Sequence, residues 1–510
     1  MQSTFELYPG RLNLPDLRWL ATFDLSLTLA PESYEDIAAG RRLIDSVIEE
    51  GKTTYGVNTG LGSLASTPIA KDDLAELQRR LVLSNAAGTG PPLPDSVVRL
   101  IICLKINALA GGRSGVRREL VDALLALYNA KVVPIIPAKG SVGASGDLAP
   151  LAHLAVALIG EGEVRLEGET VAAREGLART GLVPFCLAPK EGLAMVNGTQ
   201  MSTALAVAGL FAVEAVFAAT IVAGALSVEA AIGQHMAFDH RIHEARGQRG
   251  QVDVAAAMRA LLAGSELRGV AAREGRLQDP YSLRCQPQVM GACLDQLRYG
   301  ADIIAREINA VTDNPLVFAE DGDILYGGNF HAEPVGLAAD SIALALSEIG
   351  AMAERRVAML TDANHSRLPP FLVRSGGLDS GFMVAQVTAA ALASENKGLA
   401  HPVTADSIPT TANHEDFVSM SARAAYRLEE MADNAAAIAA IELLAACQGL
   451  EFRRPIRSSD SLEAAFAAVR ERVPAYDTDR FFAPDLAAIK DLVRSGRFLD
   501  LVPASMRMTL

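Results

Sequence analysis

Aromatic side chains are scarce in this chain of 510 residues. They make up 5% of the sequence and include a single tryptophan, whereas hydrophobic residues as a whole reach 50%. Alanine and leucine must therefore fill most of the core, and because both are strong helix formers we expect closely packed helices. A chain of this length is able to bury a large core and to hold several domains.

Cysteine is sparse, and its spacing is irregular. No two of the five cysteines form a C-x-x-C pair: Cys103, Cys186, Cys285, Cys293 and Cys447. This pattern argues against a disulfide framework or a zinc site and is typical of reduced thiols in a cytoplasmic protein. The first residues show neither the basic stretch nor the apolar core of a signal peptide. The eight histidines include no H-E-x-x-H motif, so we expect no metal.

Positive charge is in deficit. The chain has 46 lysines and arginines against 60 acidic residues, which gives a net charge of −14. Nucleic-acid binding needs concentrated basic residues, so we expect no nucleic-acid partner. The most membrane-like stretch, residues 204–232, is interrupted by Glu214 and Glu229. We expect it to be a helix buried inside the protein and expect no membrane partner.

Long helical patterns dominate the second half of the chain. They cover residues 201–232, 286–311, 332–360, 381–399 and 422–448. Short stretches around residues 163–171 and 316–326 predict β-hairpins. The expected fold is mainly α, an elongated bundle of long helices over residues 201–510 with a smaller mixed N-terminal part, residues 1–200, that contains short β-hairpins. We see no clean linker and expect one catalytic unit.

The most unusual stretch is Gly140-Ser141-Val142-Gly143-Ala144-Ser145-Gly146-Asp147, with three glycines and two serines between apolar segments. Such density predicts an irregular loop. A phosphate-binding loop needs its lysine after the glycines, and Lys139 precedes them. A nucleophile elbow needs G-x-S-x-G, and here the second glycine comes one residue early. In a third interpretation the Gly146 nitrogen attacks the Ala144 carbonyl, and loss of two waters turns the Ser145 side chain into a methylene on an imidazolone ring.

Continued to His153, this run resembles the signature of the aromatic amino acid ammonia-lyases, and most closely that of the histidine-acting members. The resemblance recurs from about Thr53 to Phe482 and so covers nearly the whole chain. It implies an electrophile, 4-methylidene-imidazol-5-one (MIO), formed from Ala144-Ser145-Gly146 without an external cofactor. It also implies a homotetramer whose active sites borrow residues from several chains.

The resemblance assigns roles to Tyr55 and Asn197. Removal of a weakly acidic β-proton needs a strong base, and a tyrosine serves only if its pKa falls from about 10 toward the working pH. Tyr55 lies in Tyr55-Gly56-Val57-Asn58-Thr59-Gly60, which looks like the family's base-bearing loop. Asn197 precedes a long helix and would be an ordinary N-cap. The resemblance instead implies a place beside the electrophile and the substrate carboxylate.

A second specific motif is Leu277-Gln278-Asp279-Pro280-Tyr281-Ser282-Leu283-Arg284. The planar guanidinium of Arg284 suits a carboxylate. The motif resembles the family's, which implies that Arg284 holds the substrate α-carboxylate with the catalytic Tyr281 and Gln278 nearby. In the family, the position of Phe330 lines the pocket and supports formation or reactivity of the electrophile.

Two positions bear on the choice of substrate. Acids that follow Asn413 are ordinary at a helix start, yet histidine-acting relatives carry Glu at position 415, where phenylalanine- and tyrosine-acting ones typically carry an amide. Asn85 stands where histidine-acting enzymes commonly have His. It can donate or accept a hydrogen bond but cannot titrate. Leu61 replaces a usual Phe and His414 a usual Gln.

We therefore expect an ammonia-lyase that takes a small amino acid and converts L-histidine to trans-urocanate and ammonia. Asn85 keeps an alternative open: a lyase for tyrosine, phenylalanine or a modified histidine, or a 2,3-aminomutase. A catalytically inactive helical scaffold is a further alternative, against which the set of Tyr55, Ser145, Asn197, Tyr281 and Arg284 argues.

Overall fold

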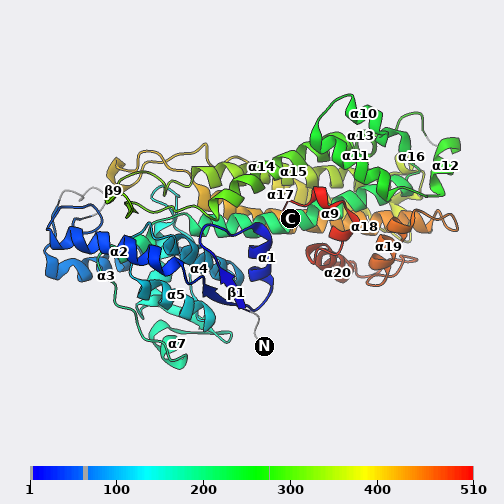
Figure 1. Ribbon diagram of the computed structural model, residues 1–510. Helices are drawn as coiled ribbons and strands as arrows, with labels where there is room; N and C mark the ends of the chain where they lie inside the picture. The colour runs from blue at the N-terminus through cyan, green and yellow to red at the C-terminus, as the bar shows by residue number, and fades with distance from the viewer. Residues whose placement is uncertain (1–3, 61–66, 275, 509–510) are drawn as a thin grey trace. The chain divides into compact units, whose positions relative to one another are not determined.

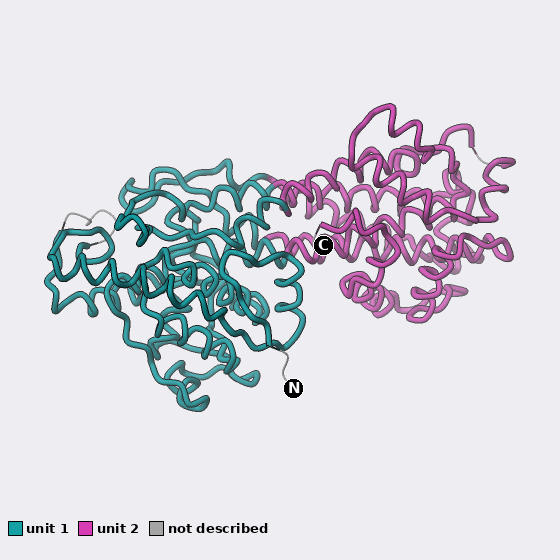
Figure 2. Tube along the Cα trace, in the orientation of Figure 1, with its two compact units in different colours: residues 1–208, 302–340, 402–426 teal, residues 209–301, 341–401, 427–510 magenta. Residues whose placement is uncertain are grey.

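The computed structural model describes residues 4–60, 67–274 and 276–508 (Figure 1). Leu61 lies outside the described residues. The chain divides into two compact units (Figure 2). Unit 1 comprises residues 1–208, 302–340 and 402–426, and unit 2 comprises residues 209–301, 341–401 and 427–510. Each unit is therefore assembled from segments that are distant in sequence.

Unit 1 combines helices with short strands. Its own helices are α1 (Leu14–Thr22), α2 (Ser33–Glu49), α3 (Leu74–Asn85), α4 (Asp95–Ala110), α5 (Arg118–Asn129), α6 (Leu148–Leu158), α7 (Ala173–Arg179) and α8 (Glu191–Val196). The strands are β1 (Thr4–Leu7), β2 (Ser26–Leu29), β3 (Thr89–Pro92), β4 (Val133–Pro134), β5 (Pro137–Lys139), β6 (Glu163–Leu166), β7 (Glu169–Ala172), β8 (Leu316–Phe318) and β9 (Asp323–Leu325). The predicted hairpins are confirmed as the antiparallel pairs β6-β7 and β8-β9. In addition, β1 pairs with β2 in parallel, β3 with β5, and β4 with β6.

All five predicted long helices are present. They are α9 (Gln200–Ala230), α14 (Gln286–Glu307), α15 (Glu333–Thr361), α17 (Met383–Leu399) and α18 (Ser421–Glu451). The unit boundaries fall within all of these except α17. Unit 2 adds the helices α10 (His240–Glu244), α11 (Arg249–Leu261), α12 (Leu267–Glu274), α13 (Tyr281–Arg284), α16 (Ala363–Ser366), α19 (Asp460–Arg470) and α20 (Ala483–Arg494). The mainly α fold class is confirmed.

Two helices, α9 and α15, are long and apolar enough to cross a membrane by length and composition alone. In their most apolar windows, 83% and 72% of the residues are buried inside the protein. Such burial is what core helices of a folded domain show. The expectation of a buried helix at residues 204–232 is thus confirmed for α9.

A buried ion pair lies between the long helices of unit 2. Arg356 on α15 and Glu442 on α18 are both fully buried and form a two-pronged ion pair, with Arg356 Nη2 2.8 Å from Glu442 Oε2. Ser227 Oγ on α9 also donates to Glu442 Oε1 at 2.7 Å. Three helices are therefore joined at one buried carboxylate, and this arrangement fixes their register.

We expect Glu442→Leu to lower the free energy of unfolding by about 3–5 kcal/mol, because it leaves the Arg356 guanidinium buried without its counter-charge. The double variant Arg356→Met/Glu442→Leu should recover most of this loss. Asp302→Leu, which removes the exposed partner of Arg306, is the control and should change little. Thermal unfolding of the variants measures the effect. Equal losses in the single and double variants would contradict this account of the pair.

Candidate active site

The glycine-rich loop of residues 140–147 is held by backbone bonds from distant segments of unit 1. Gly143 O accepts from Ala332 N at 3.1 Å, and Val142 O accepts from Met420 N at 2.8 Å. Ala332 immediately precedes α15 and Met420 immediately precedes α18. The starts of two long helices are thus fixed against the loop, and helix starts carry partial positive charge.

Gly146 can only be glycine. Its φ is +72°, in the left-handed region, and a Cβ at this position would lie 2.2 Å from Gly198 O. The two glycines form a parallel bridge, and Asp147 N donates to Gly198 O at 2.7 Å. The sequence predicted unusual backbone geometry in this loop, and Gly146 has it. Gly146 is also the residue whose nitrogen must be unhindered if it is to attack the Ala144 carbonyl.

Asp147 ties the end of the loop to the first turn of α9. It is fully buried and accepts hydrogen bonds from Ser141 Oγ at 2.8 Å, Ser202 N at 2.7 Å and Ser202 Oγ at 2.7 Å. Burial raises the pKa of Asp147, and the bonds from Ser202 and Ser141 oppose that shift. The carboxyl group is thus fully engaged in holding the loop.

Asn197 and Glu415 contact Ser145 at two different atoms. Asn197 Nδ2 donates to Ser145 O at 2.8 Å, and the Ser145 hydroxyl donates to Glu415 Oε1. The Asn197 side chain therefore does not cap α9. Its Oδ1 is buried and has no hydrogen-bond partner in the described part of the chain. A buried amide oxygen of this kind is available to accept a hydrogen bond.

Glu415 is placed by a tight turn and not by a helix start. Thr411, Ala412 and Asn413 have φ of +50°, +55° and +64°, and Thr410 and Glu415 are paired through their backbones. The hydroxyls of Thr410 and Thr411 donate to Glu415 Oε2 at 2.6 and 2.9 Å. Burial alone would raise the pKa of Glu415, but the hydroxyls of Ser145, Thr410 and Thr411 and the charge of His414 lower it below its usual value. The group is therefore a carboxylate at neutral pH.

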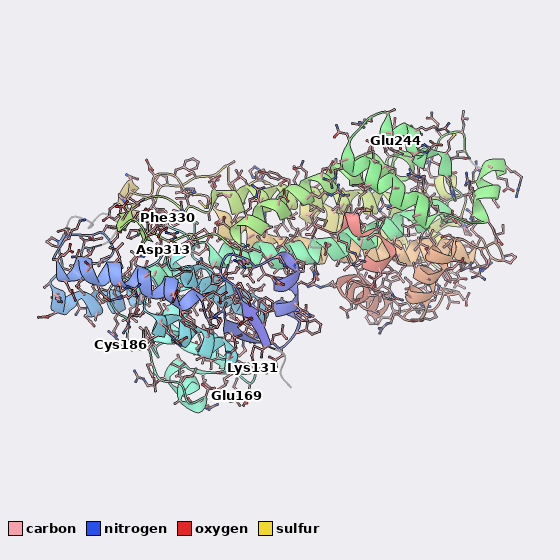
Figure 3. The ribbon with its side chains drawn as sticks, viewed as in Figure 1. Lys131, Glu169, Cys186, Glu244, Asp313 and Phe330 are labelled. Carbon is pink, nitrogen blue, oxygen red and sulfur yellow. The ribbon has the colours of Figure 1, made fainter. Side chains whose placement is uncertain are left out.

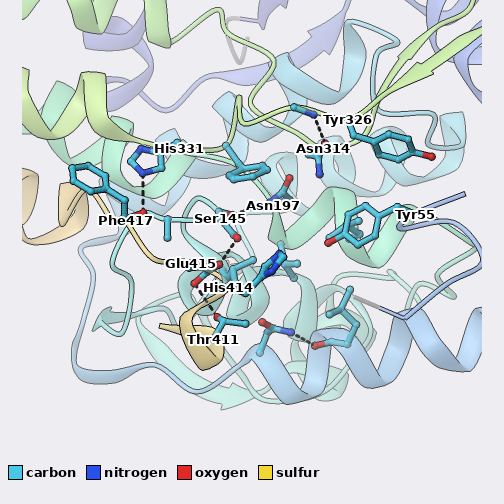
Figure 4. A pocket seen from close by; sticks show the side chains of 18 of the residues that line it. Tyr55, Ser145, Asn197, Asn314, Tyr326, His331, Thr411, His414, Glu415 and Phe417 are labelled. Carbon is cyan, nitrogen blue, oxygen red and sulfur yellow. Dashed lines mark hydrogen bonds between the residues drawn. The ribbon is translucent and has the colours of Figure 1, made fainter. Parts of the chain in front are cut away.

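These residues surround a cavity of about 880 Å³ in unit 1 (Figure 4). Seven of the residues singled out in the sequence line it: Tyr55, Asn85, Ala144, Ser145, Asn197, Phe330 and Glu415. Phe330 follows the β8-β9 hairpin (Figure 3). His414 lines the same cavity. The structure therefore brings together residues spread over 361 positions, from 55 to 415, at one concave surface.

Tyr55 reaches the cavity from a turn that requires a glycine. Gly56 has φ of +73°, and a Cβ there would lie 2.4 Å from Leu193 Cδ2. Asn58 Oδ1 accepts from Thr54 N at 2.7 Å and closes the turn. The Tyr55 ring packs edge-on against Tyr326, with ring centroids 6.2 Å apart. The loop expected around Tyr55 is thus a hydrogen-bonded turn at the cavity wall.

Asn85 is the last residue of α3, and its amide is partly committed. Asn85 Nδ2 donates to Leu81 O, one turn earlier, at 2.8 Å. This bond fixes the orientation of the amide, because a carbonyl oxygen can only accept. Its Oδ1 is therefore the atom with which Asn85 can accept a hydrogen bond from a ligand.

The cavity residues that the sequence did not single out include Asn314, Tyr326, His331 and Thr411. A signal existed for Tyr326 and His331, because both flank the glycine-rich turn that carries Phe330. Nothing in the sequence pointed to Asn314. Its side chain is held by a residue farther along the chain, because Gly327 N donates to its Oδ1 at 2.9 Å. Among the described residues, no group of three or more His, Cys, Asp or Glu side chains is arranged to hold a metal ion.

Gln278, Tyr281 and Arg284 belong to unit 2 and do not line the cavity. Arg284 Nε donates to Asp279 O at 3.0 Å, and its guanidinium carbon lies 4.6 Å from the centre of the Tyr281 ring. Gln278 and Tyr281 are exposed. The three side chains form a polar surface of unit 2 that still has donors to offer.

We expect Gly146→Ala to lower the thermal midpoint more than Gly168→Ala. Both residues have positive φ, so both substitutions introduce backbone strain of about 1–2 kcal/mol. Only the Gly146 side chain would collide with a backbone oxygen, whereas nothing lies within 4 Å of a Cβ at Gly168. Equal shifts in thermal unfolding of the two variants would show that the approach of Gly146 to Gly198 is not a constraint.

Comparison with known proteins places this geometry in a family. The family model for aromatic amino acid lyases matches residues 12–471. A histidine ammonia-lyase from Aromatoleum aromaticum is 58% identical over 500 residues, covering 98% of this chain and 95% of that protein. The crystal structure of histidine ammonia-lyase from Trypanosoma cruzi superposes with a TM-score of 0.92 at 38% identity, covering 100% of this chain and 97% of that chain.

A tyrosine aminomutase from Streptomyces globisporus shares the same fold. Its structure superposes with a TM-score of 0.92 at 35% identity, and the match covers 98% of each chain. The fold alone therefore accommodates both ammonia-lyases and aminomutases. Because the family model matches most of the chain and the similarity extends over nearly its whole length, the chain belongs to the aromatic amino acid lyase family.

Proposed function

We propose that this chain eliminates ammonia from L-histidine and releases trans-urocanate, using an MIO group formed from Ala144-Ser145-Gly146. The observation that carries the proposal is the Glu415 carboxylate, which lines the same cavity as Ser145 and Asn197. A carboxylate suits an imidazole or an ammonium group and would be costly beside a plain phenyl ring. The similarity to proteins named histidine ammonia-lyase supports the same substrate.

The residues of the loop fit an MIO group. Gly146 leaves its nitrogen free of side-chain crowding, and the Ser145 carbonyl is fixed by Asn197 Nδ2. Ring closure joins Gly146 N to the Ala144 carbonyl carbon, and the carbonyl oxygen leaves as water with the amide hydrogens of Gly146 and Ser145. Loss of the Ser145 hydroxyl with the Ser145 Cα hydrogen, as a second water, completes the change. When formed, the group supplies an electrophilic carbon at the cavity surface. No external cofactor is needed.

Asn197 is suited to hold the amino acid. One of its amide hydrogens is bound to Ser145 O, and this bond fixes the amide orientation. Its unpartnered Oδ1 can accept from the substrate ammonium, while the second amide hydrogen remains for the carboxylate. Tyr55 lies on the same cavity and would remove the β-proton. A positioned base of this kind typically contributes 10²–10⁴-fold to the rate, as an order of magnitude.

The substrate side chain would meet Glu415, His414 and Asn85. The Asn85 oxygen can accept from an imidazole N–H, because its nitrogen is bound to Leu81 O. Glu415 would orient the imidazole or the ammonium group. His414 adds a ring that can donate or accept. Histidine thus remains compatible with the cavity although position 85 carries no imidazole.

The carboxylate-binding residues are proposed to come from other subunits of a homotetramer. Arg284, Tyr281 and Gln278 lie in unit 2 and do not line the cavity of unit 1. Gln278 and Tyr281 are exposed and Arg284 is partly exposed, so all three are able to contact a partner. Arg284 keeps donors beyond the Nε that is bound to Asp279 O. In the assembly, Arg284 of the partner subunit would hold the α-carboxylate. We also propose a cytoplasmic location, since all five cysteines are free.

The purified enzyme should release ammonia and trans-urocanate from L-histidine. We expect the Asn85→Ala variant to have a kcat/KM for histidine that is reduced about tenfold, the effect of losing one hydrogen bond. Ultraviolet absorbance follows urocanate, and a coupled assay follows ammonia. Tyrosine and phenylalanine are run in parallel, and chromatography tests for β-amino acids. Turnover of either aromatic amino acid without turnover of histidine, or a β-amino acid product, would overturn the proposal.

Co-expression of Ser145→Ala with Arg284→Met should restore part of the activity that each variant lacks alone. Each single variant should lose at least about a hundredfold in kcat/KM, because an electrophile or a substrate anchor is missing. In mixed tetramers, some sites combine an intact loop from one chain with an intact Arg284 from another. Two affinity tags isolate the mixed assemblies for assay. Mixed tetramers that stay inactive would show that sites are not shared.

A further inference from the structure

Lys105 is buried in the middle of α4, where the neighbouring residues are apolar. Its side chain is 1% exposed, and Leu104 and Ile106 beside it are equally buried. A lysine in such a place is costly unless its ammonium group is well bound. The charge of the Asp313 carboxylate acts on Lys105, but this carboxylate forms its ion pair with Lys190, at 2.7 Å. Lys105 therefore takes its hydrogen bonds elsewhere.

The partners of Lys105 are two backbone carbonyls beside the cavity. Its Nζ donates to Ala194 O at 3.0 Å and to Asn197 O at 2.8 Å. These carbonyls lie at the C-terminal end of α8, where partial negative charge favours a cation. Burial lowers the pKa of Lys105 to about 7, and the charge of Asp313 opposes this shift. The bonds to Ala194 O and Asn197 O thus stabilise the Lys105 ammonium group inside the protein, where burial alone disfavours its charge.

Asn197 links Lys105 to the reacting loop. Its backbone oxygen is bound by Lys105, and its side-chain Nδ2 donates to Ser145 O at 2.8 Å. The backbone on either side is also held, because Asn197 N donates to Leu193 O at 2.9 Å and Gly198 O accepts from Asp147 N at 2.7 Å. Lys105 adds a bond to the carbonyl of Asn197 itself and so helps to set the direction in which the Asn197 amide points.

We propose that Lys105 is a positioning residue for the conversion of Ala144-Ser145-Gly146, an inference that rests on the proposed function. In the second dehydration, the Cα–H bond of Ser145 breaks and its electron pair forms the Cα=Cβ bond. The Cβ–Oγ bond breaks, and the departing hydroxide combines with the proton as water. A hydrogen bond to the Ser145 carbonyl stabilises the charge that develops there, and Lys105 holds the Asn197 donor in place.

The two water losses should respond differently to Lys105. Ring closure joins Gly146 N to the Ala144 carbonyl carbon, and neither atom is the one that Asn197 contacts. The second loss depends on the Ser145 carbonyl, which Asn197 does contact. A specific delay of the second loss is therefore the signature of positioning, whereas a general loss of stability would delay both.

Lys105→Met tests the proposal in the full-length chain. The protein is made by cell-free synthesis, and intact mass is followed with time beside the wild type. We expect the variant to accumulate a species that has lost one water and to lose the second about tenfold more slowly or worse, the effect of one hydrogen bond to a charged group. Lys105→Gln replaces it if the methionine variant does not fold.

Asn107→Leu is the matched control on the same helix. Asn107 is buried and polar, but its side chain contacts Ile308 O at 2.8 Å and Gly10 N at 3.1 Å, away from the loop. This variant should lose stability and still lose both waters at the wild-type rate. Circular dichroism and thermal unfolding monitor the fold of each variant.

Several outcomes would overturn the inference. They are wild-type water loss in Lys105→Met, an equal delay in Lys105→Met and Asn107→Leu, and failure of both Lys105 variants to fold when Asn107→Leu folds. The last result would assign Lys105 a purely architectural role. A wild-type chain that loses no water would instead refute the proposed function itself, so the two failures are distinguishable.

Discussion

The contact between Gly146 and Gly198 is the constraint on which the rest of the site depends. The two backbones approach so closely that a single added carbon at Gly146 would lie 2.2 Å from Gly198 O. This approach requires glycine at position 146 and brings Asn197, the neighbour of Gly198, onto the Ser145 carbonyl. Backbone packing thus fixes the position of the loop relative to Asn197.

The polar groups around this contact have different roles. Asp147 and Ser202 fix the end of the loop, Asn197 holds a carbonyl, and Glu415 contacts the hydroxyl that the proposed conversion removes. The bond from Ser145 Oγ can exist only before dehydration. Its loss would free Glu415 Oε1 for the substrate, while Thr410 and Thr411 continue to hold Oε2. One carboxylate can therefore serve the unconverted loop first and the substrate afterwards.

Much of this structure was predictable from the sequence because it is local. The long helices follow from long apolar patterns, and the loop follows from glycine density. Tertiary contacts account for what was missed. The sequence predicted that helix α14 continues to Val311, but it ends at Glu307. Beyond this end, the amide of Asn309 makes hydrogen bonds with the backbone of Leu12, 297 residues away.

The site could be predicted mainly where the chain resembles its family. Tyr55, Asn197 and Glu415 were identified in this way, and all three line the cavity. The left-handed turn before Glu415 was not foreseen, because threonine and alanine rarely adopt positive φ. The sequence did not point to Lys105 either, because its role depends on hydrogen bonds to carbonyls at the end of α8, which only the folded structure brings near it.

Mass spectrometry of the peptide Gly140–Arg165, released by trypsin from the wild-type protein, tests the central claim most directly. The peptide should be lighter than its sequence by two waters, with both losses located between Ala144 and Gly146. A peptide of unmodified mass, with an intact serine at position 145, would contradict it.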